Sequence, residues 1–284
     1  MSQTTLNGSP TPAPAPAHVP RPPYKVTARR VLRSEWAKLW SLRSTWITLG
    51  LGLLFLLGFG VIAAVHYHAD STSGRQMRPY DAHATALSLS LFGTNFAQLA
   101  LGVLGVLATA GEYSTGTIRS TLAAVPRRLP VLWSKAAVLG LVALLVATAG
   151  VFAAFPIGAG VVSGTPAALS LSHPGVVRSL LGAGLYLGLV TVIGVALGAL
   201  LRSVAGAIAV LIASLMLVPG LVSLLPSSWQ DDISEFLPSN AGASLFALTH
   251  DPTSLPPAAG LLVLLGWTAL ALTGAAYRLL RTDA

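Results

Sequence analysis

The chain has 284 residues, of which 54% are hydrophobic and only 9% are charged, and its mean hydropathy is +0.73. Soluble domains carry about 25% charged residues, so this chain has too little polar surface to face water on all sides. It contains no cysteine, which excludes a disulfide framework and any site that needs a thiolate. The net charge of +8 would suit nucleic acid, but the distribution of the charges along the chain gives it another meaning.

Residues 1–24 are rich in proline, alanine, serine and threonine and contain no apolar run. This composition predicts a disordered, partly polyproline tail, and it lacks the apolar core of a signal peptide. The remaining residues, 25–284, are expected to form one membrane domain.

Residues 27–43 have the pattern of an amphipathic helix. The apolar positions recur at helical spacing and the basic ones fall mostly elsewhere: Leu32, Trp36, Leu39 and Trp40 against Arg29, Arg30, Arg33 and Lys38. Glu35 is the single acid of this segment. A basic helix with tryptophans beside a hydrophobic span is typical of the membrane interface. A helix that packs on its own protein outside the membrane is the alternative.

Six apolar stretches are long enough to cross the ~30 Å hydrocarbon core of a bilayer as helices. None of them contains Asp, Glu, Lys or Arg, and they comprise residues 44–65, 86–110, 136–160, 179–201, 203–224 and 257–277. The predicted fold class is therefore an all-α polytopic membrane protein with six transmembrane helices. The outer segment 225–256 is expected to add short helices at the outer surface.

Lysine and arginine residues concentrate on one side of this topology. With the amino terminus placed inside, only three of the 17 bases fall in outer segments, namely Arg75, Arg78 and Arg178. Six of the nine acids fall outside: Asp70, Asp81, Asp231, Asp232, Glu235 and Asp251. The positive-inside rule therefore predicts a cell-membrane protein with both termini in the cytoplasm. The net charge then reflects orientation in the membrane, and no nucleic-acid partner is expected.

Polar side chains and small-residue motifs are few within the spans. Asn95 and Gln98 lie one helical turn apart in the second span, and Tyr186 lies in the fourth. Such side chains bond a neighbouring helix or line a pathway. The fourth span also carries two GxxxG motifs, Gly184–Gly188 and Gly194–Gly198, which suit close packing within the subunit or a dimer seam.

Motifs for catalysis or for an internal energy source are missing from the chain. It has no GxxxxGK[ST] phosphate-binding loop, no HExxH and no GxSxG. No carboxylate lies in a predicted span, as ion-coupled carriers commonly require. We therefore expect no catalytic residue, and uphill transport would need energy from another chain. Solvated loop histidines are favoured over a metal site made of His66, His68, Asp70, Asp81 and His83.

Residues 111–135 are unusual because one acid and four bases stand there between two long apolar runs. Ile118, Leu122 and Val125 recur at helical spacing, which predicts a short amphipathic helix at the inner face. Arg119 lies off this stripe, and Arg127 follows the proline that ends it. The helix either rests on lipid headgroups or docks a protein.

The stretch GEYSTGTIRSTLAAVPRR, with Lys135 after it, resembles the cytoplasmic segment of permease subunits of ATP-binding-cassette (ABC) exporters of the second type. The matching positions are, in order, Glu112, Gly116, Thr117, Arg119, Pro126, Arg127 and Lys135. Residues 32–46 are similar to the amino-terminal interfacial helix of the same permeases. The six-span plan with a long last outer loop also fits, whereas the Pro/Ala-rich tail is longer than in that pattern.

The resemblance implies a chain that has no ATPase activity and binds no cofactor itself. Two six-span halves, from a homodimer or with a sister permease, would form the export pathway among membrane lipids. Separate ATP-binding subunits would hold ATP and magnesium. The segment between spans two and three would be the coupling helix, which contacts the ATPase together with the interfacial helix.

The expected contacts with the ATPase follow from the same resemblance. On the coupling segment they are Glu112, Thr117, Ile118, Arg119, Leu122 and Arg127, and on the interfacial helix they are Arg33, Glu35, Trp36 and Lys38. Ile118 and Leu122 would fill a groove on the ATPase, while Glu112 and Arg119 would fix the register by charge pairing. A non-transporting membrane scaffold or sensor built on the same fold is the alternative function.

Overall fold

The computed structural model describes residues 27–67, 84–124, 128–249 and 254–281, without the side chains of residues 119, 122–124 and 231. Six helices in these ranges are long and apolar enough to cross a membrane: Arg43–Val65, Ala86–Ser114, Leu129–Val161, Val176–Leu201, Val204–Val222 and Pro257–Arg281. The prediction of an all-α chain with six spans is confirmed for this part of the chain, and it indicates a multi-pass membrane protein. The predicted tail, residues 1–24, lies outside the described ranges.

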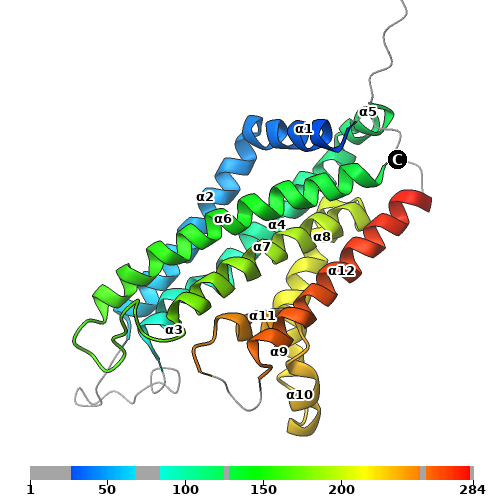
Figure 1. Cartoon of the computed structure of the whole chain (residues 1–284). Coiled ribbons are helices and arrows are strands. Elements are labelled where there is room, and N and C mark those ends of the chain that lie inside the picture. The colour runs from blue at the N-terminus through cyan, green and yellow to red at the C-terminus, as the bar shows by residue number, and fades with distance from the viewer. Residues whose placement is uncertain (1–26, 68–83, 125–127, 250–253, 282–284) are drawn as a thin grey trace, which may run out of the picture.

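The first half of the chain forms α1, a break at Leu42, and three spans (Figure 1). Its elements are α1 (Ala28–Ser41), α2 (Arg43–Val65), α3 (Ala86–Ser90), the 3-10 turn η3 (Leu91–Gly93), α4 (Thr94–Ser114), α5 (Thr117–Ala124) and α6 (Leu129–Val161). The helix α3, the turn and α4 together make the second span.

The second half adds three further spans and two short helices. Its elements are α7 (Val176–Leu201), α8 (Val204–Ile212), the π-helical segment η4 (Ala213–Leu217), α9 (Val218–Val222), α10 (Ser227–Ser234), α11 (Pro238–Phe246) and α12 (Pro257–Arg281). The segment from α8 to α9 is the fifth span. The helices α10 and α11 are the short helices that the sequence predicts for residues 225–256.

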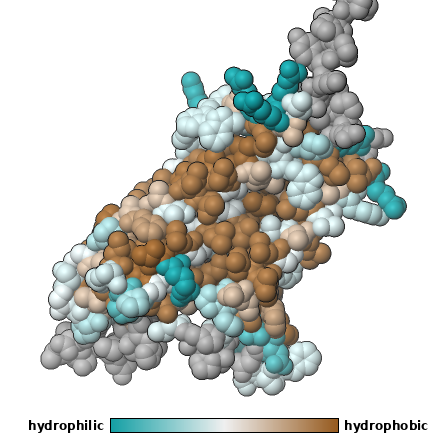
Figure 2. Space-filling view, in the orientation of Figure 1, coloured by the Kyte–Doolittle hydropathy of each residue, from teal (hydrophilic) through white to brown (hydrophobic). Residues whose placement is uncertain are grey.

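The two ends of the bundle differ in what they carry. Figure 1 shows α1, α5 and the carboxyl end of α12 at one end, which we call the α1 end, and α10 at the other. Between the ends, Figure 2 shows an apolar surface over the spanning helices, with hydrophilic residues gathered above and below it. A hydrophobic band of this kind is what a helical bundle presents to lipid.

Arginine side chains hold helix ends together at the α1 end. Arg128, which precedes α6, donates a hydrogen bond to the carbonyl of Leu279 on α12 at 3.3 Å. Arg278 of α12 donates to the carbonyl of Leu200 on α7. Both carbonyls belong to the last turns of their helices, where backbone acceptors lack intrahelical partners.

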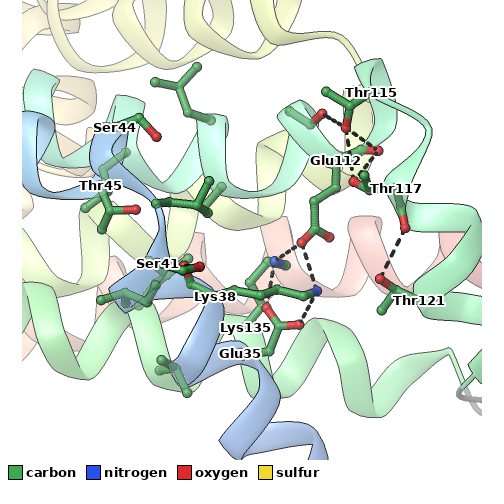
Figure 3. Close-up of a pocket in the computed structure, with 18 of the residues that line it drawn as sticks. Glu35, Lys38, Ser41, Ser44, Thr45, Glu112, Thr115, Thr117, Thr121 and Lys135 are labelled. Atoms are coloured by element: carbon green, nitrogen blue, oxygen red, sulfur yellow. Dashed lines mark hydrogen bonds and ion pairs between the residues drawn. The ribbon is translucent and has the colours of Figure 1, made fainter.

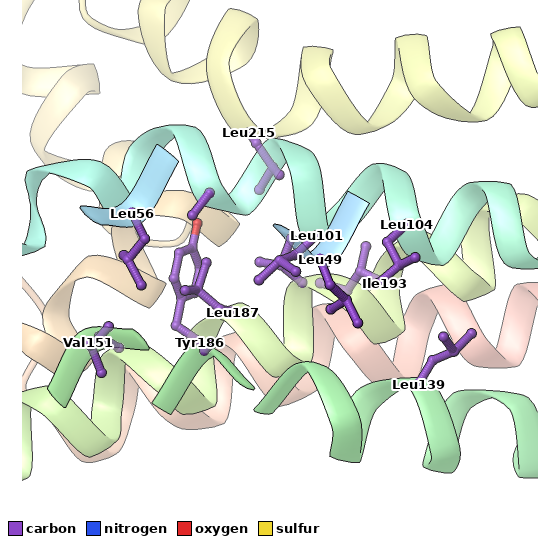
Figure 4. Close-up of a cluster of buried hydrophobic side chains, with 14 of the residues drawn as sticks. Leu49, Leu56, Leu101, Leu104, Leu139, Val151, Tyr186, Leu187, Ile193 and Leu215 are labelled. Atoms are coloured by element: carbon purple, nitrogen blue, oxygen red, sulfur yellow. The ribbon is translucent and has the colours of Figure 1, made fainter. Parts of the chain in front are cut away.

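The helix α7 forms the centre of the bundle. In α7, 72% of the apolar stretch is buried inside the protein, against 17% in Val204–Val222 and 22% in Pro257–Arg281. The buried cluster drawn in Figure 4 joins α7 to α2, α4, α6 and η4, through Leu187, Leu49, Leu101, Leu139 and Leu215. The fifth and sixth spans therefore leave most of their apolar surface open to lipid or to another chain.

Glycines of α7 face the backbones of its two main neighbours. A methyl group added at Gly194 would lie 2.1 Å from the carbonyl oxygen of Gly102 on α4. One added at Gly184 would lie 2.1 Å from the Thr148 hydroxyl of α6. Both GxxxG motifs are thus used for packing within the chain, rather than for a dimer seam.

A sharp turn joins the fourth and fifth spans. Arg202 adopts the left-handed conformation, with φ of 55°, directly after α7. The hydroxyl of Ser203 then accepts a hydrogen bond from the backbone N–H of Gly206 at 3.3 Å and caps α8. Such a tight connection fits the single residue that separates the predicted spans 179–201 and 203–224.

Candidate functional site

Four charged side chains from three helices meet at the α1 end and form a closed ring, shown in Figure 3. The Lys38 ammonium lies 2.8 Å from Glu35 Oε1 and 3.0 Å from Glu112 Oε1. The Lys135 ammonium lies 2.7 Å from Glu35 Oε2 and 2.9 Å from Glu112 Oε1. Each lysine therefore bridges both acids, and the formal charges within this ion-pair network sum to zero.

Helical spacing on α1 places two members of the network. Val31, Glu35 and Leu39 are buried, and their spacing of four residues makes them one face of the helix. The side chain of Lys38, one turn from Glu35, is 35% exposed at the edge of this face. The helix packs on α6 and α2 through this face, so Glu35 must enter the protein together with two apolar residues.

The other two members lie on spanning helices, which differs from the prediction. The sequence predicts spans 86–110 and 136–160, with Glu112 and Lys135 in the segment between them. In the structure α4 continues to Ser114 and α6 begins at Leu129, so both residues are helical. The opposite charges neutralise each other, which allows the helices to continue beyond their apolar stretches without an isolated buried charge.

The electrostatic environment keeps the α1 members of the network charged. Burial alone would raise the pKa of the Glu35 carboxyl, but Lys135 and Lys38 outweigh it and hold the pKa below its ordinary value of 4.5. Burial would lower the pKa of Lys38, but its bonds and charge interactions with Glu35 and Glu112 hold it above 10.5. Glu35 and Lys38 are therefore ionised over the physiological pH range.

One oxygen of the network is left without a partner. Glu112 Oε2 is buried, and no hydrogen-bond donor reaches it among the residues that the structure describes. The network also forms one wall of a pocket of about 620 Å³ between α1, α2, α4, α5 and α6. An enclosed carboxylate oxygen without a donor costs free energy, so the hydrogen bonds of the network are not fully satisfied.

The short helix α5 leaves α4 through Gly116, which has a positive φ of 74° and so occupies a conformation that suits glycine. The Thr117 side chain is exposed, and its hydroxyl donates to the Glu112 carbonyl at 3.4 Å. Ile118, in contrast, is only 5% exposed. We expected Ile118 to fill a groove on a partner, but here it packs inside the chain.

The structure does not describe the side chains of three other residues that the sequence predicts to contact the ATPase. Arg119 and Leu122 belong to α5, but their side chains are outside the description, and Arg127 lies outside the described residues altogether. The Glu112 charge is already used by Lys38 and Lys135 within the chain. Charge pairing between Glu112, Arg119 and an ATPase therefore stays a prediction.

The apolar residues predicted for the amphipathic helix do not share one environment. Leu39 is buried, whereas Leu32, Trp36 and Trp40 are 39%, 44% and 52% exposed. Trp40 contacts Trp36 and also Trp46 of α2, with ring centroids 5.8 Å and 4.6 Å apart. The tryptophans thus form an outward aromatic face, and Arg33 is exposed as well.

The three polar residues predicted for the spans differ in exposure: Tyr186 and Gln98 are buried, and Asn95 is exposed. The Tyr186 hydroxyl of α7 donates to Gln98 Oε1 of α4, and both side chains are buried. These two residues therefore bond neighbouring helices rather than line a pathway. Asn95 is exposed, and its amide donates to the Phe92 carbonyl at 3.1 Å.

The described residues give no support to a metal site near His66, which the sequence disfavours. No group of three or more His, Cys, Asp or Glu side chains suited to a metal ion occurs within them. His66 is described, and its Nδ1 lies 2.9 Å from the Ile62 carbonyl. The other four candidates, His68, Asp70, Asp81 and His83, fall in the part of the chain left undescribed.

The sequence predicts a role for each member of the network but not their contact with one another. It places Glu35 and Lys38 on the interfacial helix and Glu112 on the coupling segment, and Lys135 enters only as the last residue of the motif. The sequence holds one signal, because Glu35 and Glu112 are the single acids of two basic segments that adjoin charge-free spans. A lone carboxylate at the end of a span favours pairing with a nearby base. No protein-family profile matches this chain, and no curated protein sequence matches it at a significant level.

Proposed function

We propose that this chain is the permease subunit of an ATP-driven export system of the ABC type. It forms half of the translocation pathway in the cell membrane, with both termini in the cytoplasm. The observation that carries the proposal is α5, an eight-residue helix between spans two and three that lies at the same end as α1. A partner that drives the spans needs such projecting elements to act upon.

The ion-pair network supports a mechanical role for these two elements. It joins α1 to the last turns of α4 and the first turns of α6, the two helices that flank α5. Charge pairs in a low-dielectric environment are strong and directional, so they resist independent movement of the joined helices. A push on α1 or α5 by an ATPase is therefore passed to spans two and three together.

In this proposal the partner binds to exposed residues at this end. Thr117 and Ser120 are exposed on α5, and Arg33 is exposed on α1. Trp36 and Trp40 face outward beside them and suit the lipid interface. We therefore assign α5 and the basic edge of α1 to the ATPase, and the aromatic face of α1 to lipid headgroups.

A second permease half completes the pathway in this proposal. Val204–Val222 and Pro257–Arg281 bury only 17% and 22% of their apolar stretches, and Arg43–Val65 buries 28%. Most of the apolar surface of these three spans is not buried by contacts within the chain. They supply the apolar area for a second half and for the surrounding lipid.

The test is co-purification of an ATPase with the full-length chain from its native membranes after detergent solubilisation. Ser120→Trp places a bulky side chain on the exposed part of α5, and Ser228→Trp makes the same change on exposed α10 at the opposite end. We expect wild type and Ser228→Trp to recover a protein that carries a GxxxxGK[ST] loop and hydrolyses ATP. We expect Ser120→Trp to lose it, because α5 can no longer dock.

Recovery with all three proteins would remove α5 from the contact. Recovery with none of them would contradict the permease proposal and favour a scaffold or sensor that moves no cargo. Circular dichroism and monodispersity of Ser120→Trp control for folding.

A further inference from the structure

The pocket beside the ion-pair network has the size of a ligand site. Its volume is about 620 Å³, and it lies between the elbow of α1 and α2, the inner part of α4, α5 and the start of α6. Small-molecule pockets commonly measure roughly 300–1,000 Å³. Leu42 and Ser44, both exposed, line it at the elbow, so a ligand has a way in from that side.

One wall of the pocket is polar and offers mainly acceptors. The hydroxyls of Ser41, Thr48 and Thr121 already donate to carbonyls of their own helices, at 2.9, 2.8 and 3.2 Å. Their oxygen lone pairs remain open, so this wall favours a ligand that brings O–H or N–H groups.

The same wall keeps a small capacity to donate. An ammonium group has three N–H donors. Lys38 uses two on Glu35 and Glu112, and Lys135 uses two on the same acids. A ligand group that both donates and accepts, such as a hydroxyl, matches this mixture best.

The charge balance of the wall excludes charged head groups on energetic grounds. The four charges sum to zero, and all four are engaged with each other. A charged head group would therefore lose its hydration in the pocket without meeting a net opposite charge, which costs free energy. A neutral head group adds no uncompensated charge.

Part of the lining is hydrocarbon. Leu104, Leu107 and Ala108 of α4 and Val138 and Leu139 of α6 also line the pocket. These residues belong to the second and third spanning helices. An alkyl chain packed there is removed from water, which stabilises binding in proportion to the area buried.

We propose that this pocket binds an amphiphile with a neutral, hydroxyl-bearing head group and an apolar chain. A head-group hydroxyl donates to the hydroxyl oxygen of Ser41 or Thr48 and accepts from the partly exposed Lys38 ammonium, and the chain lies along Leu107 and Val138. A glycolipid of the inner leaflet and a free alkyl glycoside share this chemistry. The inference is independent of the proposed function, because it concerns binding by this chain alone.

The test uses the full-length chain in phosphatidylcholine nanodiscs, without any ATPase. Binding of radiolabelled octyl glucoside below its critical micelle concentration is measured by competition. Octyl trimethylammonium and octyl sulfate serve as competitors with the same chain and opposite head charges. We expect octyl glucoside to bind about tenfold more tightly than either charged competitor, a difference of ~1.4 kcal/mol.

Matched variants locate the site. Ala108→Leu fills the pocket from α4 and should weaken binding about tenfold or more, since added volume in a fitted pocket displaces the ligand. Ala137→Leu makes the same change at an exposed position of α6 that does not line the pocket, and should bind like wild type. Should Ala108→Leu fail to fold, the charge series on the wild-type chain still decides the question.

Two results would overturn the proposal: equal affinity for the three head groups, or unchanged affinity in folded Ala108→Leu. Doping the nanodiscs with monogalactosyl diacylglycerol distinguishes the sources. Competition by this lipid assigns the pocket to a membrane glycolipid, and its absence assigns the pocket to a free amphiphile. Loss of ATPase co-purification leaves these measurements unaffected, so the two proposals fail separately.

Discussion

The centre of the bundle and its α1 end are held together by different forces. Around α7, glycines bring helix backbones into contact, and the interactions are short-range and uncharged. At the α1 end, four charges from three helices hold α1 against α4 and α6. The centre therefore depends on shape, whereas the α1 end depends on the pairing of charges. This difference can be tested region by region.

The largest effect is expected at Gly194. Gly194→Leu forces a side chain into the Gly102 carbonyl, since even a methyl group would lie 2.1 Å from that oxygen. We expect no folded protein, because the leucine would overlap backbone atoms that cannot move aside. Gly266→Ala is the control, because nothing lies within 4 Å of a methyl group there. Yield and thermal unfolding in detergent measure both, and a well-folded Gly194→Leu would contradict the close packing.

The next effect is expected at the network. Lys135→Met leaves Glu35 and Glu112 without their buried lysine, whose side chain is 6% exposed, and should cost about 3–5 kcal/mol. Lys38→Met should cost ~1 kcal/mol or less, because that side chain is 35% exposed and partly solvated. Thermal unfolding of both variants gives the order. Equal losses would mean that the network acts as a surface cluster.

A smaller loss of stability is expected when the buried hydrogen bond between α4 and α7 is removed. Tyr186→Phe removes the donor to Gln98 Oε1 between α4 and α7 and should cost about 1 kcal/mol. Asn95→Ala, on the exposed side of the same turn of α4, should change stability by less than about 0.5 kcal/mol. If Asn95→Ala instead abolished assembly while leaving the fold intact, Asn95 would contact a second chain.

The smallest effect concerns pH and is confined to the α1 end. Folding lowers the pKa of Glu35, so its contribution is complete above the ordinary value of 4.5 and is lost as pH falls through the lower folded value. Folding raises the pKa of Lys38, so its contribution is complete below 10.5 and is lost as pH rises through the higher folded value. The contribution of these two residues to stability should be constant between these limits, and Glu35→Gln should weaken the acid-side loss in unfolding titrations. An unchanged acid limb in Glu35→Gln would place the loss elsewhere.

The sequence predicted most of the architecture because the signals were local. Each span is a charge-free run long enough to cross the bilayer, and α1 and α5 each show helical periodicity within a short window. The turn at Arg202 also followed from the few residues between two spans. The helix ends differ from the prediction. The sequence predicts that Glu112 and Lys135 lie between helices, whereas their pairing allows both residues to lie on helices.

The sequence by itself therefore determined the number and order of the spans, since burial of an apolar helix in lipid depends on composition alone. Only the tertiary structure decided which face of α1 enters the protein, that Ile118 packs inward, and that the glycines of α7 face α4 and α6. It also decided the pairing of Glu35 with Lys135, which lie 100 residues apart. The reason is that a helix has several faces of comparable hydrophobicity in a membrane protein. Their partners are chosen by the shape and charge of distant segments, which no local pattern encodes.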